Sequence, residues 1–321
     1  MSFRFIDLFA GIGGIRIAFE EFGGQCVFTS EWDKFAQQTY VENHGEIPAG
    51  DITQVEVSEI PRFDLLLAGF PCQPFSHAGL KKGFEDTRGT LFFDIARIAK
   101  HHRPKALVLE NVKGLVGHDK GNTFREILRI LEVELGYKVS FQVLNAKHFG
   151  VPQNRERIVI VATDPKIGEF VFPPIKEKGT VLGEILDPNG KVDKKYTLSD
   201  RLWASHIRRK EDHKLKGNGF GYSLFSSKSP YTSTISARYY KDGSEILVEQ
   251  RNKNPRKLTP REAARLQGFP ESFIIPVSDT QAYKQFGNSV AVPMFRYVAK
   301  NLAPLLGGSN RAKVWKPRSA N

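Results

Sequence analysis

An apolar strand that breaks into a glycine-rich turn and then enters a helix is the feature that most restricts what this sequence can fold into. Residues 3–9 are apolar and strand-like, residues 10–14 read Ala-Gly-Ile-Gly-Gly, and residues 15–22 have the spacing of an amphipathic helix. The same alternation continues, with strands expected at 25–30, 63–68 and 106–109 and helices at 32–43, 90–101 and 122–135. Alternating strands and helices predict a doubly wound, Rossmann-like α/β domain.

The second half of the sequence changes character. Strands expected at 138–144 and 157–162 are joined by a short link, so antiparallel pairing and a mixed sheet are predicted. After these strands, the irregular and polar sequence of residues 186–257 predicts a smaller, β-rich domain. A capping box at Thr259 then predicts the start of a helix. We therefore expect a catalytic and cofactor domain at 1–185, a recognition domain at 186–258, and a hinge helix with a return to the first domain at 259–321. A helix is expected over 293–306, and the basic tail after Gly308 is expected to fray.

Charge and cysteine content narrow the class of protein. Lys and Arg number 47 against 35 Asp and Glu, a net charge of +12, which favours a polyanionic partner such as nucleic acid. Two cysteines cannot make a disulfide framework or a structural zinc site, and no metal site is expected. No apolar run has transmembrane length and no signal peptide is recognisable, so a cytoplasmic protein without membrane contact is predicted.

The glycine turn predicts a nucleotide-type site, because backbone amides at a helix N-terminus face the ligand there. Glu31 closes the second strand, 18 residues after Gly13, where a carboxylate suits ribose hydroxyls. Trp32 offers a flat surface for an adenine ring, with core packing as the alternative. The turn lacks the third glycine of the dinucleotide fingerprint, so dinucleotide and adenosylmethionine binding both stay open.

A cysteine and a carboxylate are expected at the same sheet edge. Cys72 follows the third strand in a loop stiffened by two prolines, beyond the carboxyl end of a strand, where ligands bind in doubly wound sheets. Cys26, inside a strand, is expected to be inert. Glu110 closes the fourth strand and, if buried, is expected to hold a proton near neutrality, with a salt-bridged acid as the alternative.

Two arginines, Arg155 and Arg157, precede residues 158–162 of the strand expected at 157–162. If that strand is antiparallel, its start lies at the edge that carries Cys72 and Glu110, where Arg155 and Arg157 would hold a base carbonyl or a phosphate. A solvated strand end is the alternative. The basic loop at 77–89 would close over bound nucleic acid.

Taken together, these segments resemble the DNA cytosine-5 methyltransferase family of bacterial restriction–modification systems. The resemblance covers nearly the whole chain and keeps the order of the family's motifs. The matching segments are Asp7–Gly14, Phe70–Gln73, Glu110–Val112, Gln153–Arg157, Arg261–Pro270 and Gln285–Val290.

The resemblance implies methyl transfer from S-adenosylmethionine to carbon 5 of a cytosine that is flipped out of double-stranded DNA. Cys72 would attack carbon 6, protonated Glu110 would donate to nitrogen 3, and Arg157 would hold the carbonyl at carbon 2. Arg155 would support the cysteine loop or favour its thiolate. The chain would act as a monomer, functionally paired with a cognate restriction endonuclease.

The resemblance also assigns binding residues. Those for the cofactor are Phe9, Gly11, Gly13, Glu31, Trp32, Asp51, Ile52, Pro71, Leu91, Asn288 and Val290. Those for DNA are Gln73, Ser76, Lys81, Lys82, Arg88, Thr234 and Arg238. The segment 234–243 resembles that of methylases of CC(A/T)GG and CCNGG sites, in which Thr234 would contact the backbone and Arg238 would read a guanine.

Four alternatives explain less of the sequence. An RNA cytosine methyltransferase would carry a Cys-Phe-Thr element, which this sequence lacks. An adenine methyltransferase needs Asp or Asn before a Pro-Pro pair, but Phe172 precedes Pro173 and Pro174. A Rossmann oxidoreductase leaves Cys72, Glu110 and Arg155 unexplained. A DNA-binding regulator without catalysis would need a module before the first strand, which begins at Phe3.

Overall fold

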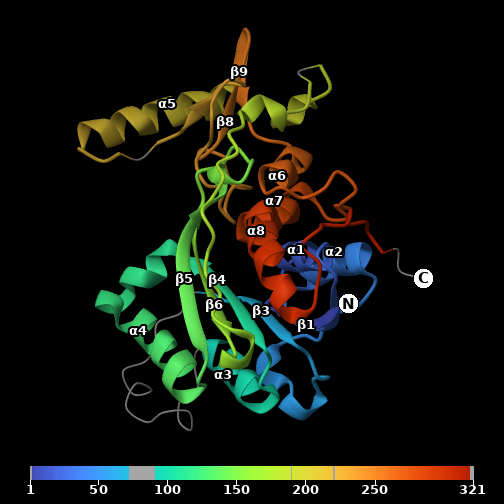
Figure 1. Cartoon of the computed structure of the whole chain (residues 1–321). Helices are drawn as coiled ribbons and strands as arrows, with labels where there is room; N and C mark the ends of the chain where they lie inside the picture. The colour runs from blue at the N-terminus through green and yellow to red at the C-terminus, as the bar shows by residue number, and fades with distance from the viewer. Residues whose placement is uncertain (1, 72–90, 189, 220, 319–321) are drawn as a thin grey trace. The chain divides into compact units, whose positions relative to one another are not determined.

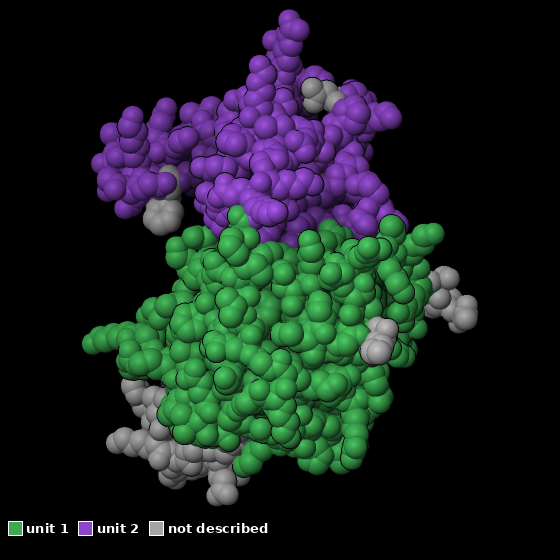
Figure 2. All heavy atoms as spheres, in the orientation of Figure 1, with its two compact units in different colours: residues 1–144, 156–175, 294–321 green, residues 145–155, 176–293 purple. Residues whose placement is uncertain are grey.

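The computed structural model describes residues 2–71, 91–188, 190–219 and 221–318. The chain divides into two compact units, coloured separately in Figure 2. Unit 1 comprises Met1–Leu144, Glu156–Ile175 and Met294–Asn321, and unit 2 comprises Asn145–Arg155 and Lys176–Pro293. The expected recognition region at 186–258 lies inside unit 2, together with the segment 145–155 and the capping-box helix.

Unit 1 is built on a six-stranded sheet in the order β2-β1-β3-β4-β6-β5 (Figure 1). The strands are β1 Phe3–Leu8, β2 Gly24–Ser30, β3 Leu65–Gly69, β4 Ala106–Val112, β5 Lys138–Asn145 and β6 Glu156–Thr163. The pairs β1–β2, β1–β3 and β3–β4 are parallel, whereas β6 runs antiparallel to β4. The predicted α/β domain with a mixed sheet is confirmed.

Helices cover both faces of this sheet, because successive strand residues point to opposite sides. They are α1 Gly14–Glu20, α2 Lys34–His44, α3 Leu91–His102, α4 Asn122–Arg129 and α8 Val292–Leu302. Ile6 and Leu8 of β1 join a core with side chains from α3 and α4. In Figure 1, α1, α2 and α8 group together on the other side of the strands.

Element boundaries differ from the predictions at informative places. β4 continues two residues past Glu110, so that Glu110 lies inside the strand. The helix expected over 122–135 changes after Arg129 into a π-helical turn, Ile130–Glu134. The tail after Gly308 does not fray as predicted: the indole nitrogen of Trp315 donates to Glu20 (3.0 Å), and the backbone of Arg318 donates to the carbonyl of Asn43 (2.9 Å).

Among its described residues, unit 2 has three α-helices, α5 to α7, and a small three-stranded sheet. The elements are α5 Asp200–Leu215, β7 Leu224–Phe225, β8 Leu247–Gln250, β9 Lys253–Arg256, α6 Pro260–Leu266 and α7 Asp279–Asn288. Short strands were predicted here, but the 16-residue helix α5 was not. Only His206 of that helix is buried, so α5 lacks the periodic apolar face that would have indicated a helix.

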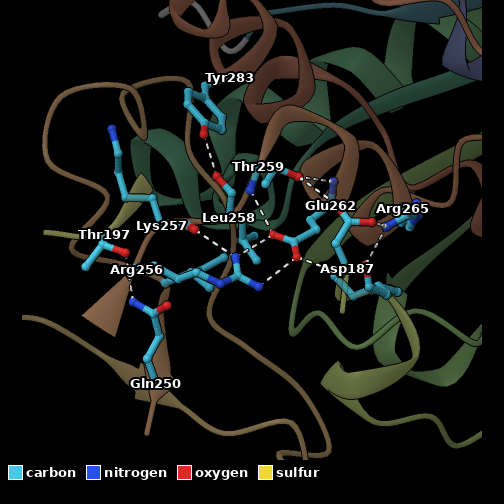
Figure 3. A network of polar contacts seen from close by, with 12 residues as sticks. Asp187, Thr197, Gln250, Arg256, Lys257, Leu258, Thr259, Glu262, Arg265 and Tyr283 are labelled. Atoms are coloured by element: carbon cyan, nitrogen blue, oxygen red, sulfur yellow. Dashed lines mark hydrogen bonds and ion pairs between the residues drawn. The ribbon is translucent and has the colours of Figure 1, made fainter. Parts of the chain in front are cut away.

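A buried ion pair joins the end of β9 to α6 (Figure 3). Arg256 and Glu262 are 1% and 0% exposed, and the guanidinium donates to both carboxylate oxygens, at 2.7 and 2.8 Å. The carboxylate also accepts the backbone amides of Thr259 and Asp187 at 2.8 Å each, and the predicted capping box is present. Because all these groups are paired, the desolvation of the two charges is offset.

No helix among the described residues is both long enough and apolar enough to pass through a lipid bilayer.

A second buried polar cluster lies beneath α1 in unit 1. Asp7 of β1 is 1% exposed, and burial raises its pKa to about 8, while the Arg16 guanidinium opposes that rise. Arg16 is fully buried, and it donates to Glu20 and to the hydroxyl of Tyr40 at 2.9 Å each, and also to Glu46. Burial likewise raises the pKa of the Cys26 thiol to about 12, which agrees with its predicted inertness.

We predict that Asp7 makes the stability of the protein fall between pH 6.5 and 7.5. In this window the folded chain holds a proton that the unfolded chain has released, so the free energy of unfolding decreases as pH rises, by at most about 1.4 kcal/mol per pH unit. Asp7→Asn removes this contribution. Urea unfolding at both pH values measures it, and an identical pH dependence in the variant would contradict the assignment.

Candidate functional site

Strand directions bring several expected site residues of unit 1 to one edge of its sheet. Leu8 is in register with Ser30 of β2 and with Ala68 of β3, so the glycine turn and Glu31 follow neighbouring strand ends. Gly69 is in register with Glu110, and Val112 with Arg157 of the antiparallel β6. The structure therefore brings the glycine turn, Glu31, Glu110 and Arg157 to one edge of this sheet, whereas Arg155, which was expected at the same edge, belongs to unit 2.

The turn that follows β1 contains residues with positive φ. Phe9 follows β1 with φ 54°, a conformation that a bulky side chain rarely adopts and that marks local strain. Gly13 caps α1 with φ 81°, and its amide donates to the carbonyl of Ala10 at 2.9 Å. A Cβ at Gly13 would lie 2.1 Å from Nε2 of the buried His44, so both the φ value and the packing require glycine.

Glu31 is tied into this turn through backbone amides. Its carboxylate accepts the amide of Gly11 at 2.7 Å and that of Asp33 at 2.8 Å. The side chain is buried, and burial raises its pKa while the two amides oppose the rise. Each carboxylate oxygen keeps acceptor capacity for a further donor, such as the hydroxyl of a ligand.

Trp32 and the segment 49–52 lie next to Glu31 in this part of the site. Trp32 is 77% exposed, so the core-packing alternative does not apply. The backbone amide of Glu31 donates to Ala49 at 3.1 Å, which brings the following Asp51 close by. Asp51 caps a short 3₁₀ turn through the amide of Thr53, and Ile52 is buried in the core behind it.

Glu110 is paired with Arg157 at the sheet edge. Nε of Arg157 lies 2.9 Å from Oε1 of Glu110, and both side chains are largely buried. A Cβ at Gly69 would be 3.4 Å from the other carboxylate oxygen, so the carboxyl lies against the end of β3. The ion pair with Arg157 corresponds to the salt-bridged alternative for Glu110.

The segment after β3 leads to the expected nucleophile. The side-chain amide of Asn111 donates to the carbonyl of Phe70 at 2.9 Å, which fixes the chain just before exposed Pro71. Leu91 is partly buried where α3 begins. Cys72 and the expected DNA contacts Gln73, Ser76, Lys81, Lys82 and Arg88 lie outside the described residues.

The remaining expected residues belong to unit 2. Arg155 is 1% exposed, and its guanidinium donates to the carbonyls of Ile235, Gly287 and Ser289 at 3.2, 3.1 and 2.6 Å. Asn288 is exposed at the end of α7 and Val290 is buried. The Thr234 hydroxyl donates to the carbonyl of Asn154 at 2.6 Å, and Arg238 is exposed.

Sequence reasoning did not single out two glutamines of unit 2. Gln153 and Gln267 are both fully buried, and the side-chain amide of Gln153 donates to the Gln267 side chain at 3.1 Å. Both stand inside the motifs that the resemblance identified, which is the signal that could have found them.

Comparison with known proteins extends this picture. The family model of the C-5 cytosine-specific DNA methylases matches residues 3–303. The chain is 60% identical over 310 residues to the Type II methyltransferase M.SsoII of Shigella sonnei, covering 95% of this chain and 81% of that protein. It is 58% identical over 315 residues to the Type II methyltransferase M.NlaX of Neisseria lactamica, covering 97% and 100% of the two chains.

Solved structures share the fold at much lower identity. The S. pombe Dnmt2 methyltransferase superposes with a TM-score of 0.76 at 20% identity, over 95% of this chain and 99% of that one. The Entamoeba histolytica methyltransferase EhMeth gives a TM-score of 0.74 at 19% identity, over 95% and 98% of the chains.

We predict that Gly11→Ala and Gly13→Ala differ sharply in stability. Both residues have positive φ, but a Cβ at Gly11 meets open space, so only the backbone cost of about 1–2 kcal/mol applies there. Gly13→Ala adds the clash with His44, and the double variant Gly13→Ala with His44→Ala should recover part of that loss. Urea unfolding of the variants measures the difference, and equal losses for the two single variants would refute the packing argument.

Proposed function

Because this chain belongs to the C-5 cytosine-specific DNA methylase family, we propose that Cys72, Glu110 and Arg157 transfer a methyl group from S-adenosylmethionine to carbon 5 of a flipped cytosine. The enzyme is a DNA cytosine-5 methyltransferase of the Type II kind found in restriction–modification systems. The observation that carries the finer proposal is the pair of Glu110 and Arg157 against the strand end that leads into Pro71 and Cys72.

The chemistry needs a nucleophile because carbon 5 of cytosine reacts poorly with a methyl sulfonium. The thiolate of Cys72 forms a bond to carbon 6, and the electron pair of the 5,6 double bond moves to carbon 5, which becomes nucleophilic. After methylation, a base removes the proton of carbon 5, the double bond reforms, and the thiolate leaves. No atom of the enzyme is consumed.

Glu110 and Arg157 stabilise the charge that this attack creates. Ring nitrogen 3 becomes basic as carbon 6 is attacked, and Glu110 enters the complex protonated and donates to it. Arg157 is already held by Glu110 and by the carbonyl of Glu156 (2.8 Å), so its remaining donors are oriented for the carbonyl at carbon 2.

S-adenosylmethionine would supply an electrophilic methyl group when bound at the glycine turn. The buried carboxylate of Glu31 would accept hydrogen bonds from the ribose hydroxyls, and exposed Trp32 would stack on the adenine. Gly11 and Gly13 would let the ligand approach the backbone, beside Phe9 and Asp51. The assignments of Ile52, Pro71, Leu91, Asn288 and Val290 remain predictions from the resemblance.

Double-stranded DNA would be recognised by unit 2 and by the basic residues around Cys72. Thr234 would contact the DNA backbone and Arg238 a guanine edge, within a site of the CCNGG type. Flipping the target base costs a few kcal/mol, which phosphate contacts would offset. We propose that the enzyme acts as a monomer in the cytoplasm, alongside a cognate restriction endonuclease.

We predict that Cys72→Ala lowers methylation of DNA by more than about a thousandfold, because the variant lacks the thiolate that would form the bond to carbon 6. Cys26→Ala is the matched control, since that thiol is buried within β2, and it should keep wild-type activity. Transfer of tritium from labelled S-adenosylmethionine to a DNA duplex measures both variants. Full activity of Cys72→Ala would end the proposal.

We predict that Glu110→Gln lowers kcat about 10²- to 10⁴-fold, because the amide cannot give a proton to nitrogen 3. Glu156→Gln is the control, because the Glu156 carboxylate pairs with exposed Lys113 at 3.0 Å, and the substitution keeps the backbone carbonyl that Arg157 uses. Steady-state methylation of a duplex at saturating concentration is the measurement. An unchanged kcat for Glu110→Gln would exclude its role as an acid.

A further inference from the structure

Residues 232–239 of unit 2 form no helix or strand, but hydrogen bonds attach them to residues 152–155. The amide of Asn154 donates to the carbonyl of Thr232 at 2.9 Å, and the amide of Thr232 donates back to Pro152 at 2.8 Å. The Thr234 hydroxyl donates to the carbonyl of Asn154. The amide of Ile235 donates to the side chain of Gln153 at 3.1 Å. Hydrogen bonds from residues 152–154 therefore fix the conformation of residues 232–235.

The guanidinium of Arg155 links the segment 232–239 to the end of α7. Nη1 donates to the carbonyl of Ile235 at 3.2 Å, while Nη2 donates to the carbonyls of Gly287 and Ser289 at 3.1 and 2.6 Å. A rigid guanidinium can hold carbonyls from two segments at fixed spacing, which an ammonium group cannot. The guanidinium is 1% exposed and holds carbonyls of both segments, so its geometry suits a role in positioning them.

Two glutamines extend the attachment to α6 and α7. Gln153 donates to the carbonyl of Leu266 at 3.2 Å and to the side chain of Gln267 at 3.1 Å. Gln267 in turn donates to the carbonyl of Phe286 at 2.6 Å. The segment that carries Thr234 is thus linked to the helices of unit 2 through fully buried polar side chains.

Gly287 fixes the next residues of the same segment by close packing. A Cβ at Gly287 would lie 2.3 Å from the carbonyl carbon and oxygen of Ser236 and 2.4 Å from the amide nitrogen of Ala237. These are main-chain atoms, which cannot rotate away as the end of a side chain would. Only glycine therefore allows the segment to rest on the end of α7.

Tyr239 anchors the far end of the segment. Its ring is fully buried, its hydroxyl donates to the carbonyl of Ile246 at 2.7 Å, and the same oxygen accepts the amide of Leu258 at 2.8 Å. Leu258 is held from its other side by the hydroxyl of Tyr283 (Figure 3). Between these anchors Arg238 is exposed, and its guanidinium has no partner among the residues that the structure describes.

We propose that residues 234–239 form a preformed reading loop and that Arg155, with Gln153 and Gly287, positions it for discrimination between DNA sequences. On this proposal, which rests on the proposed DNA substrate, Arg155 is a positioning residue and Arg238 makes the contact with the base. A rigid loop cannot move its guanidinium to a partner on a wrong base pair, so the lost hydrogen bonds are not replaced. Specificity therefore depends on residues that touch no DNA.

The test compares discrimination with turnover. The target sequence is first mapped with the wild-type enzyme, and kcat/KM is then measured on a duplex with that site and on duplexes with one altered base pair. Arg155→Lys and Gly287→Ala should each lower the ratio of the two values about tenfold, with kcat at saturating target duplex falling by less than about threefold. Arg129→Lys, which changes a surface ion pair of α4, should leave both quantities unchanged.

The opposite pattern would overturn the proposal. A kcat for Arg155→Lys that falls more than about a hundredfold, with discrimination unchanged, would make Arg155 part of the chemistry instead. Unaltered discrimination in both Arg155→Lys and Gly287→Ala would also refute the role in positioning.

Amide hydrogen exchange of the wild-type protein without DNA tests the loop even if the variants do not fold. The amides of Thr232, Ile235 and Tyr239 should exchange at least about a hundredfold more slowly than those of exposed Arg251 and Asn252 in the turn between β8 and β9. Exchange as fast as in that turn would show that the loop is not preformed. This result is independent of catalysis, so a wild-type enzyme that fails to methylate DNA would refute the proposed function but not the loop.

Discussion

The antiparallel direction of β6 determines which side chains meet at the sheet edge of unit 1. β1 to β4 are parallel, so their carboxyl ends reach one edge of the sheet, and β6 is antiparallel, so its first residues reach the same edge. Only in this arrangement does Arg157 meet Glu110, because the two belong to neighbouring strands of opposite direction. A parallel β6 would carry Arg157 to the far end of the sheet.

Unit 2 depends on a different kind of interaction. Its strands are short, and its interior contains charged and amide side chains that satisfy one another, such as Arg256 with Glu262 and Gln153 with Gln267. Hydrogen bonds with defined directions fix irregular backbone more uniquely than apolar contacts do, because apolar side chains can slide against each other. This explains how a region with few strands can still hold loops in one conformation.

The sequence pattern predicted the strands and helices of unit 1, which has strong periodicity, but missed much of the structure of unit 2. The strands and helices around the glycine turn could be predicted because apolar runs and breaker residues mark them, and the edge shared by Glu31 and Glu110 followed from strand direction. α5 was missed because it buries almost nothing, and the bonds of Arg155 were missed because carbonyls of Ile235 and Gly287 leave no trace in residue identity. The φ value of Phe9 was equally invisible, since it reflects how β1 meets its neighbours.

The contacts of the tail have a consequence for how the polypeptide acquires its structure during synthesis. Glu20 is covered by Trp315 and Arg318, and Glu21 pairs with Arg296 of α8, so the end of α1 depends on residues that come far later in the sequence. During synthesis the carboxylates of Glu20 and Glu21 therefore stay hydrated until residues 296–318 have been translated. Unit 1 can close around α1 only after that stretch is available.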